Sequence, residues 1–167
     1  MEVFSNNILL TNLIKIRWIA IFGQLFAIII AFLYFDLNIQ VLPCIYIVFF
    51  SVVVNIYSYA KNKTNNYLSD KEAFYFLLFD TIQLGFLLYL TGGIYNPFSL
   101  LLIAPLIISA SYLPIFYSIC LLILSIFIVI VISNFYVPIY WKEIFNVPYL
   151  FKYGLSLSLV LTLIFLF

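Results

Sequence analysis

The sequence lacks histidine entirely, and only 8% of its 167 residues are charged. Without histidine, the chain has neither the commonest general base nor the commonest metal ligand of proteins. A soluble domain carries roughly 25% charged residues, so this chain has too few to cover a surface that faces water. The sequence therefore favours a membrane protein and predicts neither a catalytic residue nor a metal site.

Two further scarcities narrow the possible functions. The net charge is only +1, which predicts no nucleic-acid partner. The two cysteines, Cys44 and Cys120, both lie in apolar runs and show no CxxC or metal-ligand spacing. Because free cysteine is commonly a small buried hydrophobe, we interpret both as packing residues.

Hydrophobic residues make up 67% of the chain, and its mean hydropathy is +1.25. A helix needs about 20 apolar residues to cross the ~30 Å hydrocarbon core of a bilayer. The predicted fold is therefore all-α, a polytopic transmembrane helix bundle in membrane lipid with about six spans. Pro114 separates the fourth span from the fifth, and one long bent helix is the alternative. The six apolar runs are 16–35, 41–60, 73–91, 97–113, 115–136 and 149–167.

The basic residues predict the orientation of the bundle. Five of the seven fall before the first span or between the second and third, and the two others are Lys142 and Lys152. Because short cytoplasmic loops are enriched in lysine and arginine, we expect a cytoplasmic N-terminus. Residues 1–15 are then a short cytoplasmic segment and 16–167 the membrane domain, with loop 91–98 at the outer face.

Four polar residues occur inside the predicted spans, where they are costly and usually face protein or water. Asp80 has no basic residue in any span to pair with. Counted along their helices, Gln24, Asn55, Asp80 and Gln83 fall near one depth and predict a polar layer. The layer has two interpretations: interhelical hydrogen bonds worth about 0.6 kcal/mol each, or a protonatable switch at Asp80.

The loop between the third and fourth spans, residues 91–98, concentrates turn-forming residues. Two of the five glycines are adjacent there and end the third helix, and an Asn-Pro pair forms the N-cap and first position of the fourth. The helix N-terminus and nearby aromatic rings suit a flat, lipid-soluble molecule with acceptor oxygens, such as a quinone. A plain connecting turn is the alternative. The candidate binding residues are Gly92, Gly93, Tyr95, Asn96, Pro97 and Phe98.

This loop resembles a known signature. Gly92-Gly93-x-x-Asn96-Pro97-Phe98 is similar to the GGxxNPF motif of the RegB/PrrB (ActS-like) family of redox-sensing histidine kinases. The similarity extends over nearly the whole chain. Its other parts are Arg17-Trp18 before Gly23-Gln24, Asp80 before Leu87-Leu88-Tyr89-Leu90-Thr91, and the residues from Leu101 to Pro105.

The resemblance implies the sensor domain of a two-component system in the bacterial inner membrane. It implies that the GGxxNPF segment binds ubiquinone, and that an attached kinase region makes a homodimer. Kinases of this family continue into a phospho-accepting histidine helix and an ATP-binding domain. This chain has no histidine, no glycine-rich ATP-binding boxes and no cysteine after Cys120, and it stops within the sixth run. We therefore expect the sensor portion of a longer or split protein, or a decayed remnant.

The sequence is also compatible with two other functions. A small transporter or half-transporter would use Asp80 as its proton-coupling acid and would show an internal repeat. Asp80 and the Gly-Gly pair have no counterparts in the second half of the chain. A structural membrane subunit would copurify with a partner and would not respond to quinone.

Overall fold

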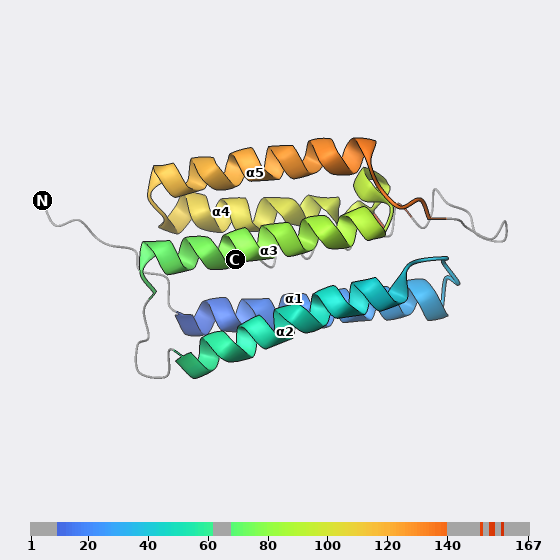
Figure 1. Cartoon of the computed structure of the whole chain (residues 1–167), viewed down its shortest axis with the longest axis horizontal. Coiled ribbons are helices and arrows are strands. Elements are labelled where there is room, and N and C mark those ends of the chain that lie inside the picture. The colour runs from blue at the N-terminus through green and yellow to red at the C-terminus, as the bar shows by residue number, and fades with distance from the viewer. Residues whose placement is uncertain (1–9, 62–67, 140–150, 152–153, 156–157, 159–167) are drawn as a thin grey trace, which may run out of the picture.

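The computed structural model describes residues 10–61, 68–139, 151, 154–155 and 158, and Figure 1 shows these residues forming a bundle of helices. No strand occurs in these ranges, in agreement with the all-α prediction. The helices are α1 (Leu10–Leu33), α2 (Val41–Lys61), α3 (Asp70–Leu90), the 3₁₀ helices η1 (Gly93–Tyr95) and η2 (Pro97–Leu102), α4 (Ile103–Tyr112) and α5 (Ile115–Asn134).

The described residues do not confirm six spans. Four helices are long and apolar enough to cross a membrane, namely α1, α2, α3 and α5. The apolar helical stretch Pro97–Tyr112 is shorter than the about 20 residues that a full crossing needs. The predicted sixth span lies mostly outside the described residues, of which Phe151, Gly154, Leu155 and Ser158 are helical.

Helix α1 begins at Leu10 rather than at residue 16. The sequence predicts Lys15 and Arg17 in the flank, because basic residues usually mark the edge of a span. In the structure both residues belong to the helix, and the side chain of Arg17 is buried. This shift of the helix start changes the interpretation of the polar residues described below.

Helix α3 begins at Asp70 because Ser69 and Glu72 form a capping box. The Glu72 backbone N–H donates to the Ser69 hydroxyl at 3.4 Å, and the Ser69 backbone N–H donates to the Glu72 carboxylate at 3.1 Å. These two bonds satisfy donors that an α-helix otherwise leaves unpaired at its N-terminus. The helix therefore starts three residues before the apolar run that predicted it.

Helices α4 and α5 are separate and antiparallel, as the sequence predicted, and are not one bent helix (Figure 1). Leu113 has an extended backbone, as a residue before proline prefers. Pro114 then precedes α5, where its missing N–H costs nothing. The Ser118 hydroxyl donates to the Ser109 carbonyl at 2.9 Å and ties the two helices together.

Helix α3 is central to the bundle. Helices α1 and α2 pack as a pair, α3 packs against α2, and α4 and α5 pack on α3 from the other side (Figure 1). Each of the three buried apolar clusters includes residues of α3, represented by Leu77, Leu87 and Leu88. The outward faces carry exposed aromatic residues such as Phe22 and Phe127, as expected where lipid is the solvent.

The connections divide between the two ends of the bundle. One end holds the start of α1, the end of α2, the start of α3 and the α4–α5 turn (Figure 1). Lys15, Lys61 and Lys71 belong to this end by their positions in the helices. The turn that follows α3, including Gly92 and Gly93, lies at the opposite end. These three lysines and the glycine turn are thus on opposite sides, and the compartment that each side faces stays a prediction.

Candidate functional site

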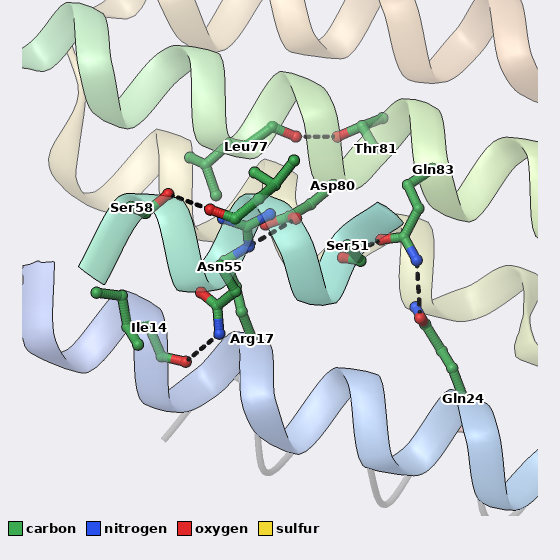
Figure 2. A network of polar contacts seen from close by, with 11 residues as sticks. Ile14, Arg17, Gln24, Ser51, Asn55, Ser58, Leu77, Asp80, Thr81 and Gln83 are labelled. Atoms are coloured by element: carbon green, nitrogen blue, oxygen red, sulfur yellow. Dashed lines mark hydrogen bonds and ion pairs between the residues drawn. The ribbon is translucent and has the colours of Figure 1, made fainter. Parts of the chain in front are cut away.

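Asp80 forms an ion pair with Arg17, so the expectation that no basic residue in a span could pair with it is wrong. The Arg17 Nε lies 3.0 Å from the Asp80 Oδ1, and the arginine side chain is only 4% exposed (Figure 2). Its guanidinium carbon lies 5.3 Å from the ring centroids of Phe76 and Phe79. Such contacts are typical of cation–π interactions. A buried arginine of α1 is therefore neutralised by an aspartate of α3.

A second set of bonds lies further along α3. The Gln83 amide nitrogen donates to the Gln24 side-chain oxygen at 2.9 Å, which joins α3 to α1. The Ser51 hydroxyl donates to the Gln83 side-chain oxygen at 3.1 Å, which joins α2 to α3 (Figure 2). Ser51 was not among the predicted residues, because a serine in an apolar run often bonds only to its own helix backbone.

Asn55 is fully buried and connects α2 to α1 rather than to α3. Its side-chain nitrogen donates to the Ile14 carbonyl at 3.4 Å, a long hydrogen bond. Of the four predicted polar residues, Gln24 and Gln83 therefore bond to each other directly. Asp80 bonds to Arg17 and Asn55 to the backbone of α1. We call the whole set the polar seam, defined as Arg17, Gln24, Ser51, Asn55, Asp80 and Gln83.

One sequence signal could have identified the Arg17 pairing. Arg17 and Gln24 are seven residues apart, which is two turns, and therefore lie on one face of α1. Asp80 and Gln83 are three residues apart and share a face of α3. Pairing these two faces matches arginine with aspartate and glutamine with glutamine, as the structure has it.

The glycine turn after α3 is closely packed. Gly92 and Gly93 both have positive φ, at 94° and 62°, and both are buried. A Cβ on Gly93 would collide with the Ile132 carbonyl oxygen and with Tyr136, and one on Gly92 would lie 3.1 Å from Ile139. Glycine is therefore required here by its backbone conformation and also by the close approach of the residues around the end of α5.

Asn96 holds the turn together. Its side-chain oxygen accepts a hydrogen bond from the Phe98 backbone N–H at 2.9 Å, so the predicted N-cap is confirmed. Its side-chain nitrogen donates to the Thr91 carbonyl at 3.0 Å and to the Thr91 hydroxyl at 2.8 Å. Because an amide group has two N–H donors, both donors of Asn96 are already directed at Thr91. Pro97 occupies the first position of η2, as predicted.

The two predicted aromatic residues lie differently. Tyr95 is 69% exposed, and its ring lies 5.7 Å from the Tyr136 ring at an interplanar angle of 66°. Phe98 is half-buried and packs on the apolar cluster that includes Leu88. The backbone N–H of Val137 donates to the Tyr89 carbonyl at 2.8 Å, which fixes the segment after α5 over the turn. Sequence reasoning missed this segment, because nothing in the motif indicates a contact some forty residues away.

Other possible sites are few in the described part of the chain. No group of three or more Cys, Asp or Glu side chains there could hold a metal ion. Cys44 is buried and Cys120 is half-buried, and neither forms a disulfide within that part. The predicted site residues lie in the polar seam and in the glycine turn.

The chain is similar to the sensor histidine kinase RegB of Cereibacter sphaeroides, with 35% identity over 159 residues. The aligned region covers 94% of this chain and 34% of RegB, so the chain spans about a third of the length of that relative. No protein-family model matches the chain, and no solved structure is significantly similar to it. The part of RegB that matches is its N-terminal membrane region, so the identity places this chain, as its motif predicts, with the membrane sensor domain of the RegB family of sensor histidine kinases.

Proposed function

We propose that the chain is the quinone-sensing membrane portion of a RegB-like sensor histidine kinase, and that the glycine turn binds the quinone. The observation that carries the proposal is the folded GGxxNPF turn, with its glycines buried and its Tyr95 ring exposed. The similarity to RegB over nearly the whole chain supports the same function. In this proposal the N-terminus is cytoplasmic, the turn faces the outside of the bacterial inner membrane, and an attached kinase region forms a homodimer.

The exposed aromatic surface at the turn supplies the ring contacts. Tyr95 and Tyr136 lie edge to face, and a flat ring such as that of ubiquinone would stack on the exposed Tyr95. The N-terminus of η2 directs its positive dipole end into the turn, where it favours an acceptor oxygen or a reduced, anionic form. Asn96 would contact the ligand only by exchanging one of its bonds to Thr91. The main role of Asn96 in this proposal is therefore to hold the conformation of the turn.

The signal in this proposal is a population shift. Oxidised and reduced quinone bind the turn with different affinities, and the difference biases the packing of α3 and η2–α4. A Cβ on Gly154 would lie 2.6 Å from the Pro97 Cγ, so Gly154 itself packs directly on the turn. That contact offers a route from the turn to the C-terminal part of the chain.

The test is titration of the purified protein in nanodiscs with a short-chain ubiquinone. Tyr95→Ala removes the exposed ring and should weaken binding about tenfold, since base–aromatic and similar ring stacking is worth about 1–3 kcal/mol. Tyr112→Ala is the matched control, because Tyr112 is also an exposed tyrosine but lies at the other end of the bundle. Equal affinities for the two variants and the natural protein would refute the assignment of the turn.

A further substitution tests whether Asn96 only holds the conformation of the turn or also contacts the ligand directly. Asn96→Asp keeps an oxygen that can cap η2 but loses the two N–H donors to Thr91. If the donors serve only to shape the turn, quinone affinity and stability should fall together. If Asn96 exchanges a bond to reach the ligand, affinity should fall more than stability does.

The transporter alternative has no specific support in the described residues. Asp80 is ion-paired with Arg17, whereas a proton-coupling acid needs to release and rebind its proton on a substrate path.

A further inference from the structure

The segment that follows α5, residues 135–139, lies across the glycine turn, and we call it the strap. Figure 1 shows it leaving the end of α5 and passing the end of α3. A Cβ on Gly93 would lie 2.7 Å from the Tyr136 Cβ, and one on Gly92 would lie 3.1 Å from the Ile139 Cδ1. The strap therefore covers both glycines of the turn.

This cover separates the glycines from a ligand on the strap's side of the turn. Gly92 and Gly93 are both buried, although both are predicted to bind the quinone. Tyr136 also occupies one side of the exposed Tyr95 ring, with 5.7 Å between the ring centroids. Aromatic rings in contact have centroids 4.5–7 Å apart, so a ring inserted between these two would need them at least about 9 Å apart. A ligand therefore reaches the turn from this side only when the strap moves away.

The strap is held by few contacts. Within the described residues, one backbone hydrogen bond joins it to α3, from the Val137 N–H to the Tyr89 carbonyl at 2.8 Å. Pro138 is exposed and has no N–H to donate. None of the strap's residues is fully buried. Segments with few buried contacts open locally at low cost while the rest of the fold stays intact, so the strap can open without unfolding a helix.

The far end of the strap reaches the core on the other side of α3. Ile139 packs against the apolar cluster that includes Ile28 of α1, Val48 of α2 and Leu87 of α3. The strap thus runs from the end of α5 to the part of the core that α1, α2 and α3 share. Its position is therefore linked to the packing of both sides of the bundle.

We propose that the strap closes the glycine turn in the absence of ligand, and that a quinone bound at Tyr95 displaces it. Opening moves Tyr136 away from Tyr95 and breaks the hydrogen bond between Val137 and Tyr89. Ile139 then leaves its apolar cluster, and the connection from α5 to that part of the core is released. The inference rests on the proposed function for the ligand that opens the strap.

The first test measures the movement of the strap directly. Spin labels replace Pro138 in the strap and Phe86 in α3, which are both exposed, in a cysteine-free background of the full chain in nanodiscs. Saturating short-chain ubiquinone should shift the distance between them to longer values, as measured by pulsed electron paramagnetic resonance. Positions 86 and 127 are the control pair, because both lie in helices that opening of the strap leaves in place. The measurement needs no variant that weakens the strap.

The second test uses the sign of a change in affinity. When a ligand binds only the open state, its apparent affinity is reduced by the fraction of molecules that are open. Ile139→Ala removes apolar contacts that hold the strap closed, so ubiquinone should bind about three- to tenfold more tightly. Ile130→Ala is the matched control, because Ile130 is 56% exposed on α5, and it should leave the affinity unchanged. Weaker or unchanged binding in Ile139→Ala would make the strap a fixed wall and overturn the proposal.

The two proposals fail separately. If Tyr95→Ala weakens ubiquinone binding but the distance between positions 86 and 138 does not respond to ubiquinone, the strap is fixed and only this inference is overturned. If ubiquinone does not bind the turn, the proposed function fails, and the strap is tested without ligand. Ile139→Ala alone should then add a population with a longer distance between positions 86 and 138, and Ile130→Ala should not. Absence of that population overturns the strap as well.

Discussion

The ion pair between Arg17 and Asp80 makes a quantitative prediction about stability. Removing one partner of a buried ion pair costs about 3–5 kcal/mol, because it leaves the other charge uncompensated. Arg17 is 4% exposed and Asp80 is 24% exposed. Leaving Arg17 without its partner therefore costs more stability than leaving Asp80 without its partner. We expect Arg17→Gln to cost about 3 kcal/mol and Asp80→Asn about 4–5 kcal/mol.

The double variant Arg17→Gln/Asp80→Asn gives the sharper test. It leaves no buried charge, so it should be more stable than Asp80→Asn alone even though it carries one more substitution. Lys15→Gln is the matched control, since Lys15 is exposed on the same helix and carries the same charge. Its cost should stay within about 0.5 kcal/mol.

The assay is unfolding of the purified protein in mixed micelles with increasing SDS, followed by far-UV circular dichroism. If Lys15→Gln and Arg17→Gln cost the same, or if the double variant costs the sum of the two single ones, the ion pair does not form. Should a single variant fail to accumulate, the charge-reversed pair Arg17→Asp/Asp80→Arg replaces it. Recovery of stability by the reversed pair would still report direct contact between the two positions.

Two further predictions concern the glycine turn and the orientation of the chain. Gly93→Ala should cost at least about 2 kcal/mol, because alanine is strained at φ +62° and its Cβ would meet the Ile132 carbonyl. A Cβ added at Gly23, in the middle of α1, would have no atom within 4 Å. Gly23→Ala should therefore be neutral or stabilising by up to about 1 kcal/mol. Thermal unfolding of both variants measures the difference. In intact cells, a membrane-impermeant maleimide should label Ile94→Cys and not Ser69→Cys in a cysteine-free background, and the reverse pattern would show that the N-terminus is outside.

The parts of the structure that depend on local sequence could be predicted. Apolar runs predicted the bounds of α2, α3 and α5 to within three residues, whereas α1 begins six residues before its predicted start. Leu113-Pro114 marked the break between α4 and α5. The Asn-Pro pair predicted the N-cap of η2, and the Gly-Gly pair predicted positive φ at the end of α3. Each of these features is fixed by residues within one or two turns of chain.

The parts that depend on how the helices are rotated could not be predicted in the same way. Basic residues usually mark the edge of a span, so the sequence predicts Arg17 in a flank, and its partner lies 63 positions away. The contact of Gly93 with Tyr136 likewise depends on where α5 ends relative to α3. Apolar side chains surround the membrane helices on all sides, so hydrophobic periodicity does not reveal which face is buried.

Helix α3 is held in different ways on its two sides. Toward α5, glycines permit close approach: a Cβ on Gly85 of α3 would lie 2.9 Å from Ile128, and Gly93 in η1 is packed against Tyr136, just after α5. Such interdigitated packing has few alternative arrangements. Toward α1 and α2, the contacts of α3 include the ion pair and two hydrogen bonds of the polar seam. Interhelical hydrogen bonds in membranes are worth only about 0.6 kcal/mol each.

A ligand at the turn should therefore move α3 together with α4 and α5, and the displacement should occur against the α1–α2 pair. Spin labels at three exposed positions, Phe22 in α1, Phe86 in α3 and Phe127 in α5, can measure this movement by pulsed electron resonance. Adding ubiquinone should change the distance distribution between positions 22 and 86 and leave that between 86 and 127 unchanged. A change confined to the second pair would place the mobile boundary between α3 and α5, and the polar seam would then be a fixed structural lock.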